Sequence, residues 1–394
     1  MPDKEDELLK GIQMKKIYMI ASGVLIVGVV FLFQNCGSST PDGSMSGGND
    51  SGGGGGITSA ATSAITVTNA ITYSGLNLDT PDAIAIDGNG YVWVGNWNLT
   101  GVTRIQPATA ATDCSSGCTA YTHITSGTYG GLTSNIRGLT IDASNNIWVP
   151  GGILMEITAA GVVKEVLTNQ HSSIGAYGAV DSSGNIWSSY VNANTSTGTQ
   201  VASYPLSNFT SSFPFGIAID SGNNAWVTIN NGVIKYPAGT TYTGGGLLSA
   251  SDVAVDNSGN VWVVNDNSGM GTGAATVTEI KAGAATDCSS GCVNFSSAAL
   301  STAEGVAIDG ANNVWIAGGL SNDASSYVIK IAPGAASDCS SGCTVYTIPT
   351  LDHPTRLAID VSGNVWIADE DADTIVEFPA LAASTVTPIV KQTR

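Results

Sequence analysis

The chain has 394 residues, of which 43% are hydrophobic, 11% are charged and 49 are glycine. This composition excludes a disordered protein and is typical of a turn-rich β protein, and a closed all-β fold can use most of such a length as one domain. The formal net charge of -18 argues against nucleic acid and anionic lipid surfaces as partners, because their phosphates repel the protein.

Residues 1–35 are expected to be a signal peptide that forms no part of the folded domain. Lys15 and Lys16 precede an apolar run over residues 17–33, which is shorter than the ~20 residues that a membrane-spanning helix needs. Met14 resembles the first residue of such a signal, so translation from Met14 is an alternative start.

Cys36 follows this run and resembles the acylated cysteine of bacterial lipoprotein signals, although Phe33 and Asn35 depart from the usual residues at their positions. We expect cleavage and lipid attachment at Cys36, which would anchor the protein in the cell envelope, facing the periplasm or at the outer membrane or cell surface. An uncleaved membrane anchor is the alternative. Residues 36–64 are rich in Gly and Ser and predict a flexible linker.

One unit recurs seven times in residues 65–394, which we expect to form a single domain. Each copy has an apolar segment ending in Asp, a turn rich in Gly and Asn, and a Trp six residues after the Asp. This pattern predicts a hairpin of two buried strands. The pairs are Asp87 and Trp93, Asp142 and Trp148, Asp181 and Trp187, Asp220 and Trp226, Asp256 and Trp262, Asp309 and Trp315, and Asp360 and Trp366.

Two further strand-like segments follow most hairpins, so each unit predicts a four-stranded antiparallel blade. The interval between copies is shortest from Asp220 to Asp256 and longest from Asp87 to Asp142, which suits the repeat length of propellers. We therefore predict a seven-bladed β-propeller. Residues 71–73 are expected to supply the fourth strand of the last blade, and residues 386–391 are the alternative closing segment.

The repeated Gly-Ile-Ala-Ile-Asp, Gly-Asn and Val-Trp-Val pattern resembles NHL-repeat propellers and the related streptogramin (virginiamycin B) lyase group. The resemblance covers residues 65–394 and implies the propeller fold. Streptogramin lyases depend on magnesium and open a cyclic lactone by elimination with a histidine base. The resemblance extends to the scaffold only, and the catalytic histidine and metal-binding glutamate of that group are not assigned to positions of this chain.

The repeated Asp and Trp are interpreted as structural, because Asp accepts hydrogen bonds from turn N–H groups and Trp fills the space between blades. Trp97 lies outside the pattern, on a loop after a predicted second strand, and is therefore a candidate for ligand contact.

Three Asp-Cys-Ser-Ser-Gly-Cys segments place cysteines four residues apart, just before predicted fourth strands. Local disulfides are expected, since export permits them and no cysteine except Cys36 is left over. We expect these bridges to pin outer hairpins and not to hold the ring shut. Metal binding is the weaker alternative, because no histidine lies near enough in sequence to complete a tetrahedral site. The pairs are Cys114 with Cys118, Cys288 with Cys292, and Cys339 with Cys343.

Loops at one mouth of the central channel are the expected place for a ligand. They carry a polar and uneven set of side chains, and a solvated surface is the alternative interpretation. The predicted ligand-contacting residues are Trp97, Arg137, Tyr177, Glu304, His353 and Arg356. Asp369, Asp371 and Asp373 alternate as ligands of a calcium or magnesium ion do, although the EF-hand Gly and Glu are missing. A general base would have to be His171 or His353, and catalytic residues remain unassigned.

We therefore expect a monomeric, surface-displayed propeller with a binding or scaffolding role, whose partner is a protein, a glycan or a small molecule. No cofactor is required for this role. The alternative is a metal-dependent enzyme that is streptogramin lyase-like or lactonase-like.

Overall fold

A computed structural model describes residues 64–98, 101–121, 136–150, 154–167, 177–188, 192–194, 200–203, 215–266, 275–297, 300, 302–319 and 326–385. The chain divides into two units, Met1–Gly56 and Ile57–Arg394, and every described residue belongs to the second. The expected signal, Cys36, the linker up to residue 63, and segment 386–391 lie outside the described residues.

Every regular element in these ranges is a β-strand. Among the described residues there is no helix that could cross a membrane.

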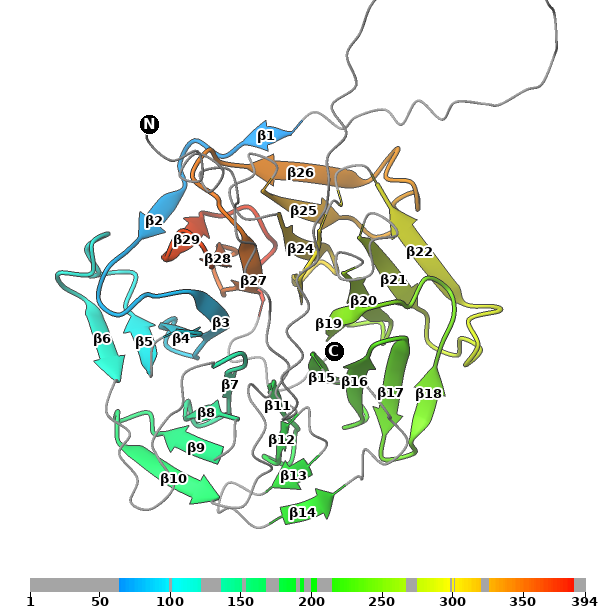
Figure 1. Cartoon of the computed structure of the whole chain (residues 1–394), viewed down its shortest axis with the longest axis horizontal. Helices are drawn as coiled ribbons and strands as arrows, with labels where there is room; N and C mark the ends of the chain where they lie inside the picture. Colours follow the sequence, from blue (N-terminus) through cyan, green and yellow to red (C-terminus); the bar gives the residue numbers. More distant parts are fainter. Residues whose placement is uncertain are drawn as a thin grey trace, which may run out of the picture. The chain divides into compact units, whose positions relative to one another are not determined.

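Six sheets have four antiparallel strands each, and we name each sheet after its inner strand (Figure 1). The β3 sheet holds β3 (Pro81–Ile86), β4 (Val92–Asn96), β5 (Val102–Ile105) and β6 (Cys118–Tyr121). The β7 sheet holds β7 (Thr140–Ile141), β8 (Ile147–Val149), β9 (Leu154–Ile157) and β10 (Val163–Leu167). The β11 sheet holds β11 (Gly178–Val180), β12 (Ile186–Ser188), β13 (Asn192–Asn194) and β14 (Gln200–Ser203).

The other three sheets of this form follow in the second half of the chain. The β15 sheet holds β15 (Ile217–Ile219), β16 (Ala225–Ile229), β17 (Gly232–Tyr236) and β18 (Thr240–Tyr242). The β19 sheet holds β19 (Ala250–Val255), β20 (Val261–Asn265), β21 (Thr276–Ile280) and β22 (Cys292–Ser296). The β27 sheet holds β27 (Pro354–Ile359), β28 (Val365–Asp369), β29 (Thr374–Phe378) and, as its outer strand, β2 (Ile71–Tyr73).

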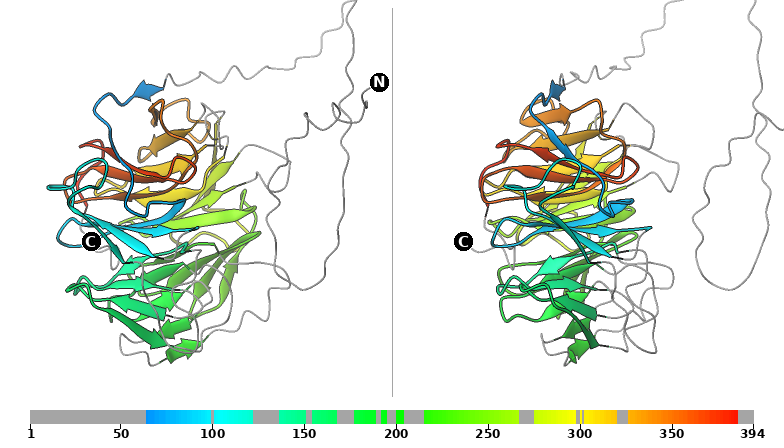
Figure 2. Two further views of the ribbon diagram at one scale, coloured as in Figure 1. Left: turned by 60° about the vertical axis from the view of Figure 1, so that its left-hand side comes forward. Right: turned by 90° about the vertical axis from the view of Figure 1, so that its left-hand side faces the viewer.

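The β23 sheet differs from these, because it has five strands. It holds β23 (Gly305–Ile308), β24 (Val314–Gly318), β25 (Tyr327–Ile331), β26 (Cys343–Thr347) and β1 (Ile65–Thr66). β1 runs parallel to β26, and the two lie side by side in both views of Figure 2. The prediction of seven four-stranded antiparallel blades is therefore wrong, since only six sheets have that form. The segment just before the first blade is recruited to an outer sheet edge, where its backbone groups find partners.

The all-β propeller architecture is confirmed by the contacts between inner strands. These run from β3 through β7, β11, β15, β19, β23 and β27 and return to β3. The ring is closed by β2, which pairs with β29 with Tyr73 opposite Ile375, as the sequence predicts. Tyr73 stacks on Trp366 of that sheet, just as Tyr346 stacks on Trp315 in the β23 sheet.

The repeated Asp and Trp form one hydrogen-bonded unit at the turn between the first two strands of every sheet. In the first copy, Asp87 Oδ1 accepts the backbone N–H groups of Asn89 and Tyr91 at 2.8 and 3.0 Å. Its Oδ2 accepts the indole N–H of Trp93 at 3.0 Å. The indole bond recurs in the other six copies at 3.0 to 3.1 Å. The structural interpretation of both residues is confirmed, and the indole bond explains why the interval between them is constant.

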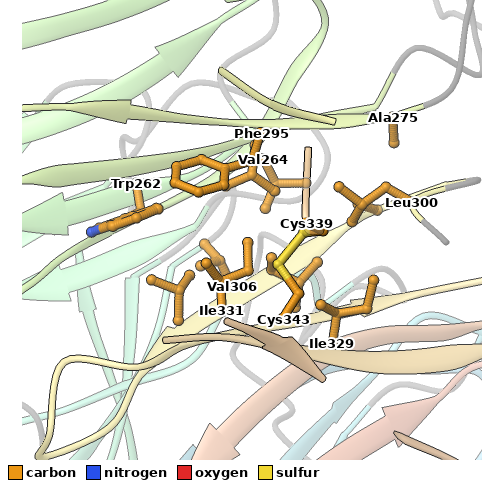
Figure 3. Close-up of a cluster of buried hydrophobic side chains, with 14 of the residues drawn as sticks. Trp262, Val264, Ala275, Phe295, Leu300, Val306, Ile329, Ile331, Cys339 and Cys343 are labelled. Carbon is orange, nitrogen blue, oxygen red and sulfur yellow. A yellow bond between two sulfur atoms is a disulfide. The ribbon is translucent and has the colours of Figure 1, made fainter. Parts of the chain in front are cut away.

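The Trp rings also fill the boundaries between sheets. Trp262 of β20 packs in one buried cluster with Val306 of β23 and with Phe295 of its own sheet (Figure 3). Burial of apolar surface at each boundary therefore joins neighbouring sheets, and the repeated tryptophan supplies much of that surface.

The three predicted disulfides are present, each joining cysteines four residues apart. The segment just before each bridge also accepts a backbone hydrogen bond from the end of the outer strand of the preceding sheet. The donor and acceptor pairs are Ser74 N to Thr112 O at 2.7 Å, Thr243 N to Thr286 O at 2.8 Å, and Ser296 N to Ser337 O at 2.9 Å. The first pair lies where β2 meets the β3 sheet, which is the closure of the ring. This bond fastens the segment before Cys114 and not the bridge itself, so the expectation that the bridges do not hold the ring shut stays a prediction.

Candidate functional site

The side chains that line the central channel are almost all apolar. Its walls come from the inner strands, which contribute Ile, Val, Leu and Ala side chains together with Thr140 and Gly178 around a volume of about 220 Å³. Thr140 is the one polar side chain in this lining, so recognition of a ligand by several polar side chains has to take place at an end of the channel.

The mouth of the channel, at the N-terminal ends of the inner strands, holds a second cavity of about 130 Å³. Its apolar floor includes Ile84, Leu139, Ile217 and Leu357, and its polar lining is Arg137, Tyr177, Asp252 and Arg356. These polar residues start different sheets, so the closed ring brings together side chains that are far apart in the sequence.

Arg356, on β27, crosses the mouth and is held by three acceptors. Its Nη1 donates to the carbonyl oxygens of Glu304 and Thr355 at 3.0 and 2.9 Å, and its Nη2 donates to the hydroxyl of Tyr177 at 2.7 Å. Its Nε is buried and has no hydrogen-bond partner among the described residues. Burial of a charged group without full pairing is costly, so this open donor marks a position where an acceptor from a ligand would be stabilised.

Arg137 lies beside this site, immediately before β7. Its guanidinium carbon is 4.0 Å from the centre of the Trp97 ring, in a cation–π contact. Its Nε is 3.6 Å from Oδ2 of Asp82, which is beyond hydrogen-bond distance, and is also buried without a hydrogen-bond partner in the described part of the chain.

His353 forms a third part of the mouth, surrounded by carboxylates. Its Nε2 is 2.8 Å from Glu304, and its Nδ1 is 3.5 Å from Glu370 and 3.3 Å from Asp371. The backbone of His353 is left-handed, with φ of 79°, which is uncommon for a residue other than glycine. Its carbonyl accepts the N–H of Glu370 at 3.0 Å and holds this conformation.

The charges at the mouth shift one another's pKa values. Burial lowers the pKa of His353, but the hydrogen bond and charge of Glu304, with Glu370 and Asp371, outweigh burial and raise it to about 9. Burial raises the pKa of Asp82 to about 6, against the opposing effect of Arg356 and Arg137. Burial and the neighbouring carboxylates of Asp82, Glu304 and Asp371 raise the pKa of Glu370 to about 7. His353 is therefore an imidazolium at neutral pH.

The structure brings the six predicted ligand-contacting residues into two adjoining groups. Trp97 and Arg137 form one group, and Tyr177, Arg356, Glu304 and His353 form the other. Whether a ligand contacts them remains a prediction.

The three aspartates predicted as metal ligands have separate partners. Asp369 accepts the backbone N–H of Asp352 at 2.9 Å, Asp371 faces His353, and Asp373 accepts the N–H of Thr80 at 2.7 Å. Within the described ranges no group of three or more His, Cys, Asp or Glu side chains is placed to hold a metal ion. His171 lies outside the described residues, so its role as a base stays a prediction.

Sequence reasoning did not single out Asp82, although the repeat contains a signal for it. Asp82, Arg137 and Glu304 each stand five residues before the repeated Asp of their copy. Alignment of the copies on that Asp would have placed all three at the same level of the ring.

No protein-family model matches the chain, and no curated protein matches its sequence. Among solved structures, the fold is similar to a virginiamycin B lyase from Staphylococcus aureus, with a TM-score of 0.60 and 17% identity over 78% of this chain and 98% of that one. A catalytically inactive histidine-to-alanine variant of a virginiamycin B lyase from the same organism, with quinupristin, gives a TM-score of 0.59 at 18% identity, over 78% of this chain and 98% of that one.

Similarity extends to other proteins. The extracellular domain of a hybrid two-component system from B. thetaiotaomicron matches with a TM-score of 0.55 and 13% identity, over 78% of this chain and 41% of that one. At these identities the comparisons show a virginiamycin B lyase-like propeller fold and no particular activity.

Proposed function

We propose that this protein is an exported, membrane-tethered binding propeller that holds its ligand at the charged mouth of the channel. The observation that carries this proposal is the Nε of Arg356, which is buried beside a cavity and, like the Nε of the neighbouring Arg137, has no hydrogen-bond partner among the residues that the structure describes. A purely structural mouth would pair such groups, because unpaired buried donors destabilise the fold.

The protonation of His353 favours binding over catalysis. A general base must be unprotonated near the working pH, whereas the carboxylates around His353 raise its pKa to about 9. At neutral pH the imidazolium is a fixed charge that orders Glu304, whose carbonyl in turn holds Arg356.

Two features support export. The N-terminal segment has the pattern of a lipoprotein signal ending at Cys36, and three disulfides are typical of an oxidising compartment. Cys36→Ala in the full chain should move the protein from the membrane fraction to the soluble fraction of the cell envelope. Retention in the membrane would support an uncleaved anchor.

The binding role is tested by a thermal-shift screen of small molecules, peptides and oligosaccharides with the full chain in detergent. We expect at least one class to raise the melting temperature, and Trp97→Ala should reduce that shift because Trp97 orders Arg137. A screen in which every stabilising ligand acts equally on the wild type and on Trp97→Ala would contradict a site at the mouth.

A lyase-like enzyme is the second candidate, favoured by the fold similarity and by the Glu304 and His353 pair. Its test is incubation of the full chain with quinupristin and magnesium. We expect no ring opening, and turnover that His353→Ala abolishes would replace the binding proposal with the lyase.

A further inference from the structure

We infer that the cavity at the mouth takes a carboxylate group of the ligand, held between Arg356 and Arg137. This inference rests on the proposed binding function and names the chemistry of the group that is bound. It follows from a count of the hydrogen-bond donors at the mouth and of the acceptors around them.

One side of the Arg356 guanidinium, formed by Nε and Nη2, is suited to bind the two oxygens of a carboxylate. A guanidinium has five N–H donors in a fixed plane. Three are used by the carbonyls of Glu304 and Thr355 and the hydroxyl of Tyr177. Among the described residues the Nε–H has no partner and Nη2 has a second N–H beyond the one given to Tyr177, and the Nε and Nη2 atoms form the side of a guanidinium that can meet a carboxylate through two parallel bonds. The three occupied donors fix the plane, so this side is preorganised.

The nearby acidic residues do not fill that edge. Asp252 directs Oδ1 to the N–H of Val253 at 2.9 Å and Oδ2 to the N–H of Val306 at 3.1 Å. The carboxylate of Glu304 forms its contact with Nε2 of His353, at 2.8 Å. Each of these acids is turned toward another partner and leaves the buried guanidinium edge open.

Arg137 supplies the second positive charge. Its guanidinium is held against the Trp97 ring at 4.0 Å, and its one ion-pair partner among the described residues, Asp82, stays 3.6 Å from Nε. Arg137 and Arg356 both line the cavity of about 130 Å³. Two arginines around one small space are the arrangement that a single anionic group would neutralise.

The size and the floor of the cavity favour a carboxylate over a phosphate. The volume of about 130 Å³ is below the ~300 Å³ at which sites for whole small molecules begin, so it suits one end group of a larger ligand. The lining includes the apolar side chains of Leu139, Ile217 and Leu357, which would pack against the carbon next to a carboxylate. A phosphate, by contrast, needs hydrogen-bond donors on every side.

The test uses propionate as the probe, with propionamide as its neutral match and inorganic phosphate as the competing anion. Binding to the full chain in detergent is measured by isothermal titration calorimetry at a fixed ionic strength. We expect propionate to bind at least tenfold more tightly than propionamide and phosphate. Equal binding of propionate and propionamide, or tighter binding of phosphate, would overturn the carboxylate assignment.

Three variants locate the effect. Arg356→Lys keeps the charge and loses the two-donor edge, and Arg137→Gln loses the charge; each should weaken propionate at least tenfold. Arg104→Gln on β5 is the matched control, since Arg104 also lies over a tryptophan, Trp93, but away from the mouth. It should leave binding unchanged. Circular dichroism and the melting temperature establish that each variant is folded, and Arg137→Gln remains informative should Arg356→Lys not fold.

Failure of this inference and failure of the proposed function give different results. If propionate does not bind but a neutral ligand from the screen loses affinity in Arg137→Gln, the carboxylate assignment is wrong and the mouth remains the binding site. If neither arginine variant changes the binding of any ligand, both proposals are wrong.

Discussion

The two ends of the inner strands differ in how far their residues repeat from sheet to sheet. At the turn between the first two strands, every sheet uses the same Asp and Trp in the same hydrogen-bonded geometry. At the other end of the inner strands, equivalent positions hold Asp82, Arg137 and Glu304, or Tyr177, Asp252 and Arg356. Repetition therefore identifies the scaffold, and departures from repetition identify the mouth, where we propose that the ligand binds.

The largest expected effect is a difference in stability between alanine variants of two tryptophans, one at each end of the sheets. Trp315, at the turn end, is fully buried, hydrogen-bonded to Asp309 and packed against the β27 sheet. Trp315→Ala should lower the free energy of unfolding by about 3–5 kcal/mol, as for other large buried aromatic residues. Trp97→Ala at the mouth should lower it by about 1 kcal/mol or less while weakening the ligand. Urea denaturation measures the free energy of unfolding of both variants. Equal losses in the two variants would contradict the distinction between a structural end and a binding end.

The disulfide loops allow a smaller comparison within the scaffold. Removal of a short loop bridge should cost about 2 kcal/mol through the freedom of the unfolded chain. Replacement of Cys114 and Cys118 by Ser should cost more than replacement of Cys288 and Cys292, because only the first of these loops lies beside the ring closure, where Ser74 N donates to Thr112 O. Equal melting temperatures of the two double variants would show that the Cys114–Cys118 bridge adds no stability to the ring closure.

The mouth should make stability depend on pH. Burial raises the pKa of Asp82 to about 6 and the pKa values of Asp369 and Glu370 to about 7, above those of the unfolded chain. Between about pH 4 and 7 the folded state therefore binds more protons than the unfolded state, and the free energy of unfolding falls as pH rises. His353, with a pKa of about 9, adds an effect of the same sign up to that pH.

We expect the free energy of unfolding to be higher at pH 5.5 than at pH 8 by at least about 1 kcal/mol. Asp369→Asn should reduce this difference, because it removes one carboxyl with a raised pKa and keeps an oxygen for the N–H of Asp352. Denaturation of both proteins across this range checks the sign. Stability that increases from pH 5.5 to pH 8 would show that the mouth carboxyls are not protonated as described.

Much of the scaffold could be predicted from the sequence, because it is repeated. The constant interval from Asp to Trp predicted the hairpins, and Tyr73, at the same distance from its Asp as Tyr346, predicted the closing strand. β1 was not predictable, since Ile65 and Thr66 show no alternation and find their partners on β26, far along the chain. Proximity in sequence also failed to predict how Asp369, Asp371 and Asp373 are used, because each turns to a different partner.

The most direct test is a crystal structure of the protein with the ligand identified in the thermal-shift screen. The predicted result places the ligand at the mouth, with an oxygen within hydrogen-bond distance of Arg356 Nε and with Arg137 on its other side. A ligand bound at the Asp and Trp turns, on the outer strands, or within the apolar channel would contradict the assignment of function to the irregular end of the ring.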